Sequence, residues 1–280
     1  MMARRLAFFG PAGTYTEEAA LLYDAGADLQ AFPTIAAVGL AVSSEITDEG
    51  VVPIENSLEG SVTFTLDLLI RESGLSIFKE VVLPINHCLM TAPGTRVADI
   101  QVVYSHPQSL AQCREFLERC FPNAQQMASL SNSAAVTDMK DSKVPAAAIG
   151  PMRAAELYGA EVIGRRIQDV ANNVTRFAVL ARQDHPPTGD DKTSICFSFE
   201  QDAPGVLYTS LGEFATRNIN LVKIESRPTK QSLGEYIFLI DCTGHRQDPL
   251  VGEAIEALGR SVSMLKILGS YPRWPGVGEK

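Results

Sequence analysis

Strand and helix patterns alternate through the first 181 residues, and this alternation limits the fold more than any other feature. Short β-branched or apolar runs are followed by segments whose apolar residues recur at helical spacing, from Arg5–Phe9 to Thr175–Ala181. Strands that alternate with helices predict a sheet covered by helices, the arrangement of α/β proteins. With 280 residues, the chain has room for more than one domain.

A long extended stretch, Leu75–Met90, separates the alternation into two sets. It contains Pro84, and a strand interrupted by proline suits a connection between two lobes. Thr175–Ala181 could return to the first lobe, so that two crossings join two α/β lobes around a cleft. The expected strands are Arg5–Phe9, Leu29–Phe32, Gly50–Ile54, Val102–Tyr104, Ala124–Met127, Ala146–Ile149 and Thr175–Ala181, and the expected helices are a first one carrying Ala19 and Tyr23, then Ile35–Ser44, Val62–Arg71, Pro107–Arg119, Asn132–Met139 and Pro151–Tyr158.

The last part of the chain has a different pattern. Arg182–Asp191 is polar, with two prolines and a glycine, and is typical of a linker. After it the order of elements is βαββαβ in about eighty residues, which predicts a ferredoxin-like fold. The expected strands are Thr193–Phe199, Ile219–Ser226, Tyr236–Cys242 and Val262–Leu268, and the expected helices are Val206–Arg217 and Pro249–Arg260.

Composition excludes several classes of protein. A net charge of −9 disfavours nucleic-acid binding and long-range attraction of an anionic substrate, so an acid must be held by local Arg, Lys or helix N-termini. The apolar run Leu6–Phe9 is too short for a signal peptide, and no stretch is long enough to span a membrane. Five scattered cysteines fit buried thiols in a reducing cytosol, and His87-Cys88 is interpreted as core packing rather than a metal site.

The first candidate site is the stretch from Val51 to Val62, which has the pattern of a strand, a polar turn and a helix. A turn at the carboxyl end of a strand is where ligands bind in open α/β sheets. Asn56 can donate and accept hydrogen bonds, and Glu55 can act as an acid or base. Alternatively, Glu55, Asn56 and Ser57 cap the helix that begins at Val62.

A glycine-rich turn after the first strand is the second candidate. Thr14 or Thr16 can cap a following helix, and the turn could hold an anion by its backbone N–H groups. A plain turn between a strand and a helix is the alternative, since neither a Walker loop nor GxGxxG is present. The turn comprises Ala12, Gly13, Thr14, Tyr15 and Thr16.

Ser105–Cys113 is the third candidate, at the start of a helix. Ser105 suits an N-cap, and Gln108 and Gln112 lie one turn apart on one face, where they could point at a ligand or remain solvated. A Ser–His nucleophile is disfavoured for Ser105 and His106, because adjacent residues do not present their side chains to each other as nucleophile and base require.

Asn172–Phe177 is the fourth candidate, in which two asparagines form a turn before a strand. Alternation along the strand places Thr175 and Phe177 on one face and Arg176 on the other. Arg176 could bind a carboxylate with both guanidinium nitrogens or could be a structural residue. Asn173 belongs to the same turn.

These stretches resemble, in order along nearly the whole chain, the motifs of prephenate dehydratases. The matching motifs are Gly-Pro-x-Gly-Thr-Tyr-Thr at residue 10, Pro-Ile-Glu-Asn-Ser-x-Glu-Gly at 53, Ser-His-Pro-Gln-x-x-x-Gln-Cys at 105 and Asn-x-x-Thr-Arg-Phe at 172. Gly205-Val206-Leu207 and Asn218–Pro228 resemble the ACT domain that accompanies this family. The resemblance implies a bilobed fold like type II periplasmic binding proteins over residues 1–182, with lobe one at about 1–80 plus 170–182 and lobe two at about 81–169, a linker at 183–191 and an ACT domain at 192–280.

The implied function is that of a lyase that converts prephenate to phenylpyruvate, with no metal or redox cofactor, in the biosynthesis of phenylalanine. Loss of CO2 and hydroxide makes the ring aromatic, so the enzyme needs mainly to protonate the hydroxyl and hold two carboxylates. Thr175 is the expected proton donor or relay. The implied catalytic residues are Thr175, Glu55, Asn56, Ser105 and Gln112, and the implied substrate contacts are Ala12, Gly13, Thr14, Tyr15, Thr16, Ser57, Gln108, Asn173, Arg176 and Phe177.

The resemblance also implies regulation by L-phenylalanine, bound between ACT domains of a cytoplasmic homodimer or homotetramer. The alternative is that this domain only dimerises the enzyme. Arogenate dehydration and a non-enzymatic solute-binding protein with a sensor domain are rival functions. Two departures from the family pattern, Ser131–Ala135 and Val206, put substrate contacts and the effector pocket in doubt. The implied effector residues are Gly205, Val206, Leu207, Asn218, Asn220, Leu221, Glu225, Ser226, Arg227 and Pro228.

Overall fold

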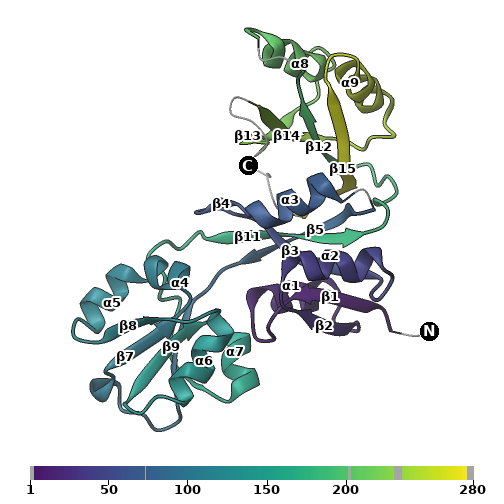
Figure 1. Ribbon diagram of the computed structural model, residues 1–280. Coiled ribbons are helices and arrows are strands. Elements are labelled where there is room, and N and C mark those ends of the chain that lie inside the picture. Colours follow the sequence, from purple (N-terminus) through teal and green to yellow (C-terminus); the bar gives the residue numbers. More distant parts are fainter. Residues whose placement is uncertain (1–2, 73, 201–202, 230–234, 276–280) are drawn as a thin grey trace. The chain divides into compact units, whose positions relative to one another are not determined.

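The computed structural model describes residues 3–72, 74–200, 203–229 and 235–275. Its strands form three sheets, and the helices between them follow the alternation that the sequence predicts (Figure 1). The mixed α/β class with a ferredoxin-like C-terminal part is therefore confirmed.

The first sheet has the order β2-β1-β3-β11-β5, with the short strand β4 paired to β3. β1 and β2 are parallel, whereas β3 and β4 form an antiparallel pair in which Asn56 faces Gly60. The polar turn of the first candidate site thus joins two hydrogen-bonded strands. The elements are β1 (Arg5–Phe9), α1 (Tyr15–Tyr23), β2 (Asp28–Phe32), α2 (Ile35–Ser43), β3 (Glu49–Asn56), β4 (Gly60–Ser61), α3 (Thr63–Arg71), β5 (Ser76–Pro84) and β11 (Val174–Ala181).

The second sheet has the order β10-β6-β9-β7-β8, with parallel β7, β8 and β9 and antiparallel β6 and β10. Apolar residues are buried on both of its faces, as expected for a sheet covered by helices. The elements are β6 (Cys88–Thr91), a 3-10 turn η1 (Val97–Asp99), β7 (Val102–Ser105), α4 (Pro107–Gln112), α5 (Arg114–Cys120), β8 (Gln125–Ala128), α6 (Asn132–Lys140), β9 (Ala146–Gly150), α7 (Met152–Tyr158) and β10 (Glu161–Arg165).

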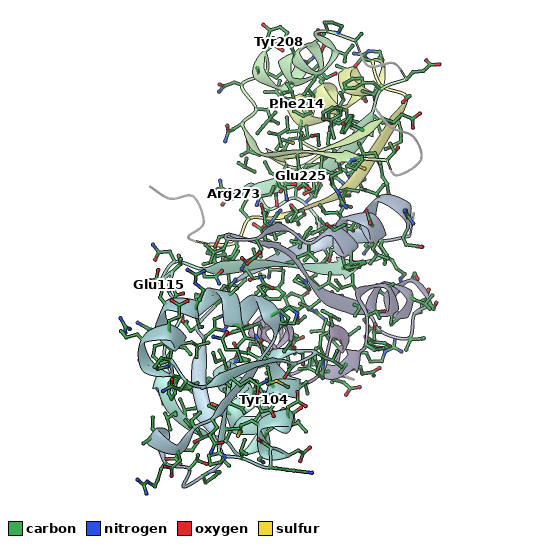
Figure 2. All side chains as sticks on the ribbon, turned by 60° about the vertical axis from the view of Figure 1, so that its left-hand side comes forward. Tyr104, Glu115, Tyr208, Phe214, Glu225 and Arg273 are labelled. Atoms are coloured by element: carbon green, nitrogen blue, oxygen red, sulfur yellow. The ribbon has the colours of Figure 1, made fainter. Side chains whose placement is uncertain are left out.

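The third sheet is antiparallel, with the order β13-β14-β12-β15 that a βαββαβ unit gives. Its two helices pack their apolar faces on the sheet around Phe197, Phe214 and Ile240. Phe214 lies inside this packing, whereas Tyr208 points outward from α8 (Figure 2). The elements are β12 (Asp191–Ser198), α8 (Val206–Ala215), β13 (Leu221–Pro228), β14 (Tyr236–Thr243), α9 (Pro249–Gly259) and β15 (Met264–Pro272).

The chain separates into two compact units that do not follow the sequence motifs. The first unit holds the whole second sheet together with β1, β2 and the turn after β3. The second unit holds the third sheet together with α3. Unit 1 comprises residues 1–38, 51–62 and 81–177, and unit 2 comprises residues 39–50, 63–80 and 178–280.

Besides the short strand β4 and the 3-10 turn η1, which were not predicted, three elements differ from the sequence prediction. The long strand predicted over Leu75–Met90 is two strands, because Pro84 lacks the N–H that would continue the ladder. The helix predicted over Pro107–Arg119 breaks at Cys113, after which the carboxylate of Asp169 accepts hydrogen bonds from the first backbone N–H groups of α5. Strand β10 was not predicted.

The predicted linker is ordered at its end. The carboxylate of Asp191, the first residue of β12, accepts hydrogen bonds from the backbone N–H groups of Thr188 and Gly189 and from the Thr188 hydroxyl. Burial alone would raise the pKa of Asp191, but these hydrogen bonds together lower it below its usual value.

None of the helices in the described residues is long and apolar enough to cross a membrane. The five cysteines are free thiols, four of them buried and Cys120 exposed.

Candidate active site

The turn between β3 and β4 is built around the side chain of Asn56, which is buried. Its Oδ1 accepts hydrogen bonds from the backbone N–H groups of Leu58 (3.0 Å) and Glu59 (3.1 Å), which fixes the turn. Its Nδ2 points across to β11 and donates to Thr175 Oγ1 at 2.9 Å. Asn56 therefore shapes its own turn, and the alternative that it caps the helix is wrong, because its side-chain oxygen bonds to Leu58 and Glu59, which lie before α3 begins at Thr63.

A hydrogen-bonded network joins side chains of all four sequence motifs, the second through Tyr15 and His87. Asn56 Nδ2 donates to Asn173 Oδ1 (2.7 Å), and Asn173 Nδ2 donates to Gln112 Oε1 (3.0 Å). His87 Nε2 lies 2.9 Å from the same Gln112 oxygen. Residues more than one hundred positions apart thus meet through neutral amide groups, which can bind a ligand's polar atoms without adding charge.

Thr175 ends this network. Its hydroxyl oxygen accepts from Asn56, and within the described residues no acceptor is found for its own proton. The side chain is buried, as the strand alternation predicts. A buried hydroxyl whose proton is not engaged is poised to donate to a bound molecule.

Arg176 lies on the opposite face of β11 and forms an ion pair with Glu55, with 2.9 Å between Nη2 and Oε2. This pair supports the structural alternative for Arg176, and the structure places Glu55 outside the network around Thr175. Phe177 is almost fully buried and packs in the core. Ser57 helps to hold the turn to β11, because Val174 N–H donates to its hydroxyl (3.0 Å).

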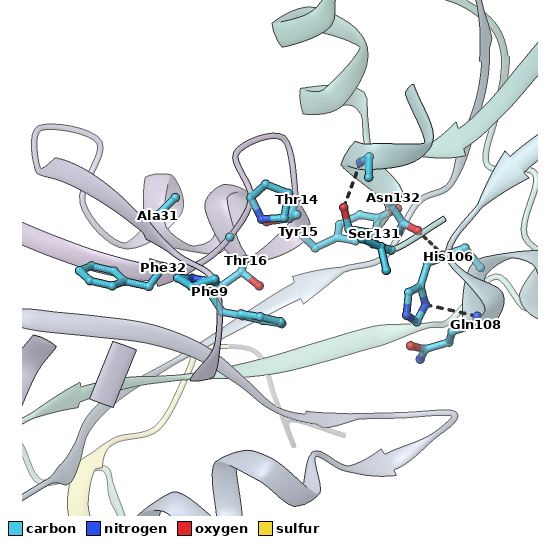
Figure 3. A pocket seen from close by; sticks show the side chains of 16 residues that line it. Phe9, Thr14, Tyr15, Thr16, Ala31, Phe32, His106, Gln108, Ser131 and Asn132 are labelled. Atoms are coloured by element: carbon cyan, nitrogen blue, oxygen red, sulfur yellow. Dashed lines mark hydrogen bonds between the residues drawn. The ribbon is translucent and has the colours of Figure 1, made fainter. Parts of the chain in front are cut away.

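A pocket of about 660 Å³ is drawn with its lining side chains in Figure 3. Tyr15 links it to the network, since it lines the pocket and its hydroxyl lies 2.9 Å from His87 Nδ1, whereas Asn56, Gln112 and Thr175 are not lining residues. This volume is in the usual range for small-molecule sites. The lining residues are Phe9, Gly10, Pro11, Thr14, Tyr15, Thr16, Ala31, Phe32, Pro33, His106, Gln108, Ser109, Leu130, Ser131, Asn132 and Ala134.

The N-termini of two helices face this pocket. Thr14 caps α1 by accepting from Glu17 N–H (3.4 Å), and Ser131 caps α6 by accepting from Ala134 N–H (2.9 Å). Helix N-termini carry partial positive charge and free N–H groups, so they favour anions. At α1 the carboxylate of Glu17 already accepts from the Gly13 N–H, so this N–H of the predicted anion-binding turn is occupied. None of the described lining residues is Lys, Arg, Asp or Glu. An anionic ligand would therefore be held by backbone and neutral donors.

Gly13 requires its conformation, because its φ of +80° and the nearby Ser133 hydroxyl leave no room for a Cβ. The Ser133 hydroxyl donates to the carbonyl oxygen of Ala12, and the Tyr158 hydroxyl lies 3.3 Å from the same oxygen. Ser133 belongs to the segment that departs from the family pattern, and it holds the Ala12–Gly13 turn against α6.

The prediction that Ser105 caps its helix is wrong. The N-cap is His106, whose Nδ1 accepts from Gln108 N–H (3.3 Å). Ser105 is fully buried, donates to the Ile149 carbonyl (2.8 Å) and lies 3.3 Å from Asn132 Oδ1. The proton of Ser105 is therefore engaged by Ile149, and the hydroxyl of Ser109 donates to Asn132 Oδ1 (2.9 Å) instead.

The two glutamines of α4 have different surroundings. Gln108 lines the pocket, whereas Gln112 belongs to the network and its Nε2 lies 3.4 Å from Glu59 Oε1. Contrary to the prediction, the two glutamines therefore do not both line the pocket: Gln108 lines it, and Gln112 bonds within the network.

Burial sets the protonation of the site's titratable groups. It lowers the pKa of His87, an effect that the hydrogen bond to Gln112 partly offsets, and it lowers the pKa of His106. It raises the pKa of Tyr15 well above its usual value, with a further contribution from Glu18. Both imidazoles are thus neutral and the phenol keeps its proton near neutral pH.

Sequence reasoning missed His87 and the apolar wall formed by Phe9, Phe32 and Leu130. His87 is almost fully buried, in agreement with core packing, but both of its ring nitrogens are hydrogen bonded. The sequence signal that could have indicated a polar role for His87 is its position inside the apolar stretch that follows Ile85. No cluster of metal-ligating side chains occurs in the described parts of the chain.

The predicted effector residues lie on α8 and β13 of the third sheet. Gly205 caps α8 with a φ of +90°, and Asn218 has a φ of +56° in the loop before β13. Arg227 is buried and forms an ion pair with Asp67 of α3 (3.0 Å). Val206 is the first residue of α8, and Leu207 packs in the core of this sheet and its helices. The Asn220 carbonyl accepts from Thr243 N–H, and Glu225 forms an ion pair with Lys223. Leu221, Ser226 and Pro228 pair with residues of β14.

The fold and site define an α/β enzyme-like protein with a neutral donor network and an anion-favouring pocket, followed by a ferredoxin-like unit. Residues 6–185 match the family model described as prephenate dehydratase, and residues 200–260 match that of the ACT domain. The chain belongs to the prephenate dehydratase family.

Two of three similar proteins are named for this family, and the third is named for a different activity. A bifunctional chorismate mutase/prephenate dehydratase of Stutzerimonas stutzeri is 41% identical over 96% of this chain and 73% of its own length. The crystal structure of a prephenate dehydratase from Arthrobacter aurescens in complex with L-Phe is 36% identical, with a TM-score of 0.89 over 96% of this chain and 90% of that one. A structure described as a novel type of quorum-quenching acylase is 30% identical, with a TM-score of 0.88 over 97% and 99% of the two chains.

Proposed function

We propose that this protein converts prephenate to phenylpyruvate, with residues 1–182 as the catalytic domain, 183–191 as a linker and 192–280 as the ACT domain. The observation that carries the proposal is the Thr175 hydroxyl, which accepts from Asn56 and keeps its own proton available. Prephenate loses a hydroxyl group, and a leaving hydroxyl needs a proton donor. Thr175 is a weak acid, so it acts by hydrogen bonding as the charge on the departing oxygen develops.

The pocket suits the rest of the substrate. Helix N-termini at Thr14 and Ser131 offer N–H groups to carboxylates, and the apolar side formed by Phe9 and Phe32 can pack against the ring. The ring carboxylate leaves as CO2, so a strong cationic ligand for it would stabilise the ground state and slow the reaction. A pocket without Arg or Lys among its described lining residues satisfies this requirement.

Each remaining residue has a role in this proposal. Asn56, Gln112 and Asn173 position the hydroxyl of Thr175, and Ser105 holds the strand end before α4 through the Ile149 carbonyl. Glu55 and Arg176 form an ion pair between the neighbouring strands β3 and β11. The substrate contacts are Ala12, Gly13, Thr14, Tyr15, Thr16 and Gln108, with Ser57 and Phe177 in the supporting frame.

An acylase activity is not favoured, although one structural relative is described by it. A threonine that attacks an acyl group must give its proton to a nearby base. Here the partner of Thr175 is an amide N–H donor, which makes the hydroxyl a poorer nucleophile.

The test is turnover of purified protein with prephenate, followed by phenylpyruvate formation, with arogenate as the rival substrate. Thr175→Ala is expected to lower kcat by roughly two to four decades, and Thr175→Ser to retain part of the activity, because serine keeps the hydroxyl. Folded Thr175→Ala protein with wild-type turnover would refute the role of this residue. Faster turnover of arogenate would replace the substrate.

L-Phenylalanine is proposed as the inhibitor, bound between ACT domains of paired subunits in a cytoplasmic homodimer or homotetramer, near Gly205–Leu207 and Asn218–Pro228. The proposal rests on the family match of residues 200–260 and on the L-Phe complex of the Arthrobacter relative. Inhibition requires that the effector bind the less active state more tightly. Calorimetry with L-phenylalanine tests it, and absence of binding at millimolar concentration would contradict it.

A further inference from the structure

The hydrogen-bond network has a direction that can be read from its fixed groups. Asn56 Oδ1 accepts from the backbone N–H groups of Leu58 and Glu59, whose hydrogens cannot move. Its Nδ2 must therefore face β11, where it also lies 3.3 Å from the Val174 carbonyl oxygen. Both contacts assign the carboxamide of Asn56 in one orientation, with the amino group toward Thr175.

The other end of the network is fixed by Glu59. A carboxylate only accepts, so the Gln112 atom 3.4 Å from Glu59 Oε1 is the amide nitrogen. Gln112 Oε1 consequently faces Asn173 and His87. The Asn173 oxygen already accepts from Asn56, which leaves its nitrogen to donate to Gln112. The assignments from the two ends agree: Asn56 donates to Asn173, and Asn173 donates to Gln112.

This polarity determines the tautomer of His87. Its Nε2 lies 2.9 Å from an oxygen that can only accept, so Nε2 carries the hydrogen. Burial keeps the ring neutral, and Nδ1 is therefore an acceptor. The Tyr15 hydroxyl, 2.9 Å away, supplies the donor, with the Asn86 carbonyl oxygen (3.0 Å) as its second acceptor.

We propose that His87 is a positioning residue for the dehydration, which holds Gln112 and, through Asn173 and Asn56, keeps Thr175 as a proton donor. The inference rests on the proposed function of Thr175. Hydrogen on Nδ1 instead would place a lone pair of Nε2 against Gln112 Oε1, and the glutamine would turn over. Its amino group would then oppose that of Asn173, and the orientation of the network would be lost.

The first test is steady-state kinetics on prephenate with His87→Leu and His87→Gln. We expect His87→Leu to lower kcat roughly 10- to 100-fold with KM changed by less than about twofold, because ligand contacts in the pocket remain while the reacting hydroxyl is misoriented. His87→Gln should recover most of the loss, since its carboxamide has an N–H donor and an acceptor. An unchanged kcat in folded His87→Leu would overturn this inference and leave the proposed function of the protein standing.

His245→Leu is the matched control. His245 is also fully buried, and its Nε2 and Nδ1 are hydrogen bonded to the His185 carbonyl (2.8 Å) and to Gln247 N–H (3.1 Å), but it lies in unit 2. This variant should lose stability and retain kcat. Equal losses of kcat in the two leucine variants would show that any buried histidine has this effect and would overturn the inference.

The second test is the tautomer of His87 by nitrogen-15 NMR of the wild-type protein, with the signal assigned by its loss in His87→Gln. Hydrogen on Nε2 supports the inference, and hydrogen on Nδ1 overturns it even if His87→Leu does not fold. Wild-type protein that leaves prephenate unchanged would instead overturn the proposed function, and this inference with it.

Discussion

Replacing Asn56 by aspartate changes one amide group into an oxygen and tests the whole network. In Asn56→Asp the first carboxylate oxygen keeps the hydrogen bonds from Leu58 and Glu59 N–H. The second oxygen replaces a donor that faces Asn173 Oδ1, the Val174 carbonyl and Thr175 Oγ1. All three facing atoms are oxygens that suit an N–H donor, so they repel the carboxylate oxygen that replaces it.

The magnitude follows from these contacts. Thr175 can turn its hydroxyl toward the carboxylate, and the Val174 carbonyl keeps its hydrogen bond from Ser57 N–H (2.9 Å), which leaves one acceptor, Asn173 Oδ1, without its donor. A buried group left unpaired costs about 1–3 kcal/mol, so the free energy of unfolding should fall by roughly 1–3 kcal/mol at pH 8. The kcat should fall by roughly two to four decades, because the Thr175 hydroxyl now donates to the introduced carboxylate and its proton is no longer available to a ligand.

The loss of stability should depend on pH in a defined direction. Burial and facing oxygens disfavour the charged carboxylate, so the pKa of the new aspartate in the folded protein lies above its unfolded value of about 3.9. The protonated form is tolerated, and the penalty grows as pH rises through the folded pKa. Urea unfolding should therefore show a smaller deficit at pH 5 than at pH 8.

The control is Asn123→Asp at an exposed turn, which should match wild type at both pH values. An Asn56→Asp deficit that is the same at pH 5 and pH 8 would refute the orientation of the Asn56 amide. Retained kcat in the folded variant would refute the assignment of Thr175 as donor.

Three further outcomes are expected. His87→Gln should reduce the fall in unfolding free energy on acidification. Burial lowers the pKa of His87, so the stability contributed by the neutral imidazole is present above about pH 6.5, the unfolded value, and is lost as pH falls toward the folded pKa. Identical wild-type and variant curves of unfolding free energy against pH, measured by urea unfolding, would contradict this. Lys192→Met should cost about 3–5 kcal/mol, because it leaves the buried Glu80 without the ammonium group 3.0 Å away, and a loss under about 1 kcal/mol in urea unfolding would argue against it. Gly269→Ala should cost about 3–5 kcal/mol, because a Cβ would lie 2.3 Å from the Ile77 carbonyl oxygen at a φ of +149°, and an unchanged melting temperature would disprove this close approach.

The order of elements could be predicted from sequence because it depends on local periodicity and turn residues. Thr14 caps α1 as expected, and the βαββαβ order gives the third sheet. The break at Cys113 could not be predicted, because the cap that starts α5 comes from Asp169, a residue distant in sequence. Strand β10 gives no clear alternation, since its ladder with β6 contains an irregularity between Val162 and Gly164.

The site was predictable where its residues occur in motifs and not where they act by shape or contact. Asn56, Gln112 and Thr175 were expected to be functional, and the structure joins them. The apolar wall at Phe9 and Phe32 has the same composition as any core strand end. His87 resembles a core residue in sequence, because its two hydrogen-bond partners come from elements far along the chain.

Helix α3 is bound at both ends by side chains of the third sheet. Arg227 pairs with Asp67 and lies 3.4 Å from the Thr63 carbonyl, while Lys266 Nζ donates to the carbonyl oxygens of Leu69, Ile70 and Glu72. A cation at the last carbonyls and a guanidinium at the Thr63 carbonyl of the first turn oppose fraying, and the Asp67 salt bridge lies one turn further on. Helix α3 is therefore held to the third sheet along its length and belongs to the same compact unit. The chain directly before this helix is the Asn56–Gly60 turn.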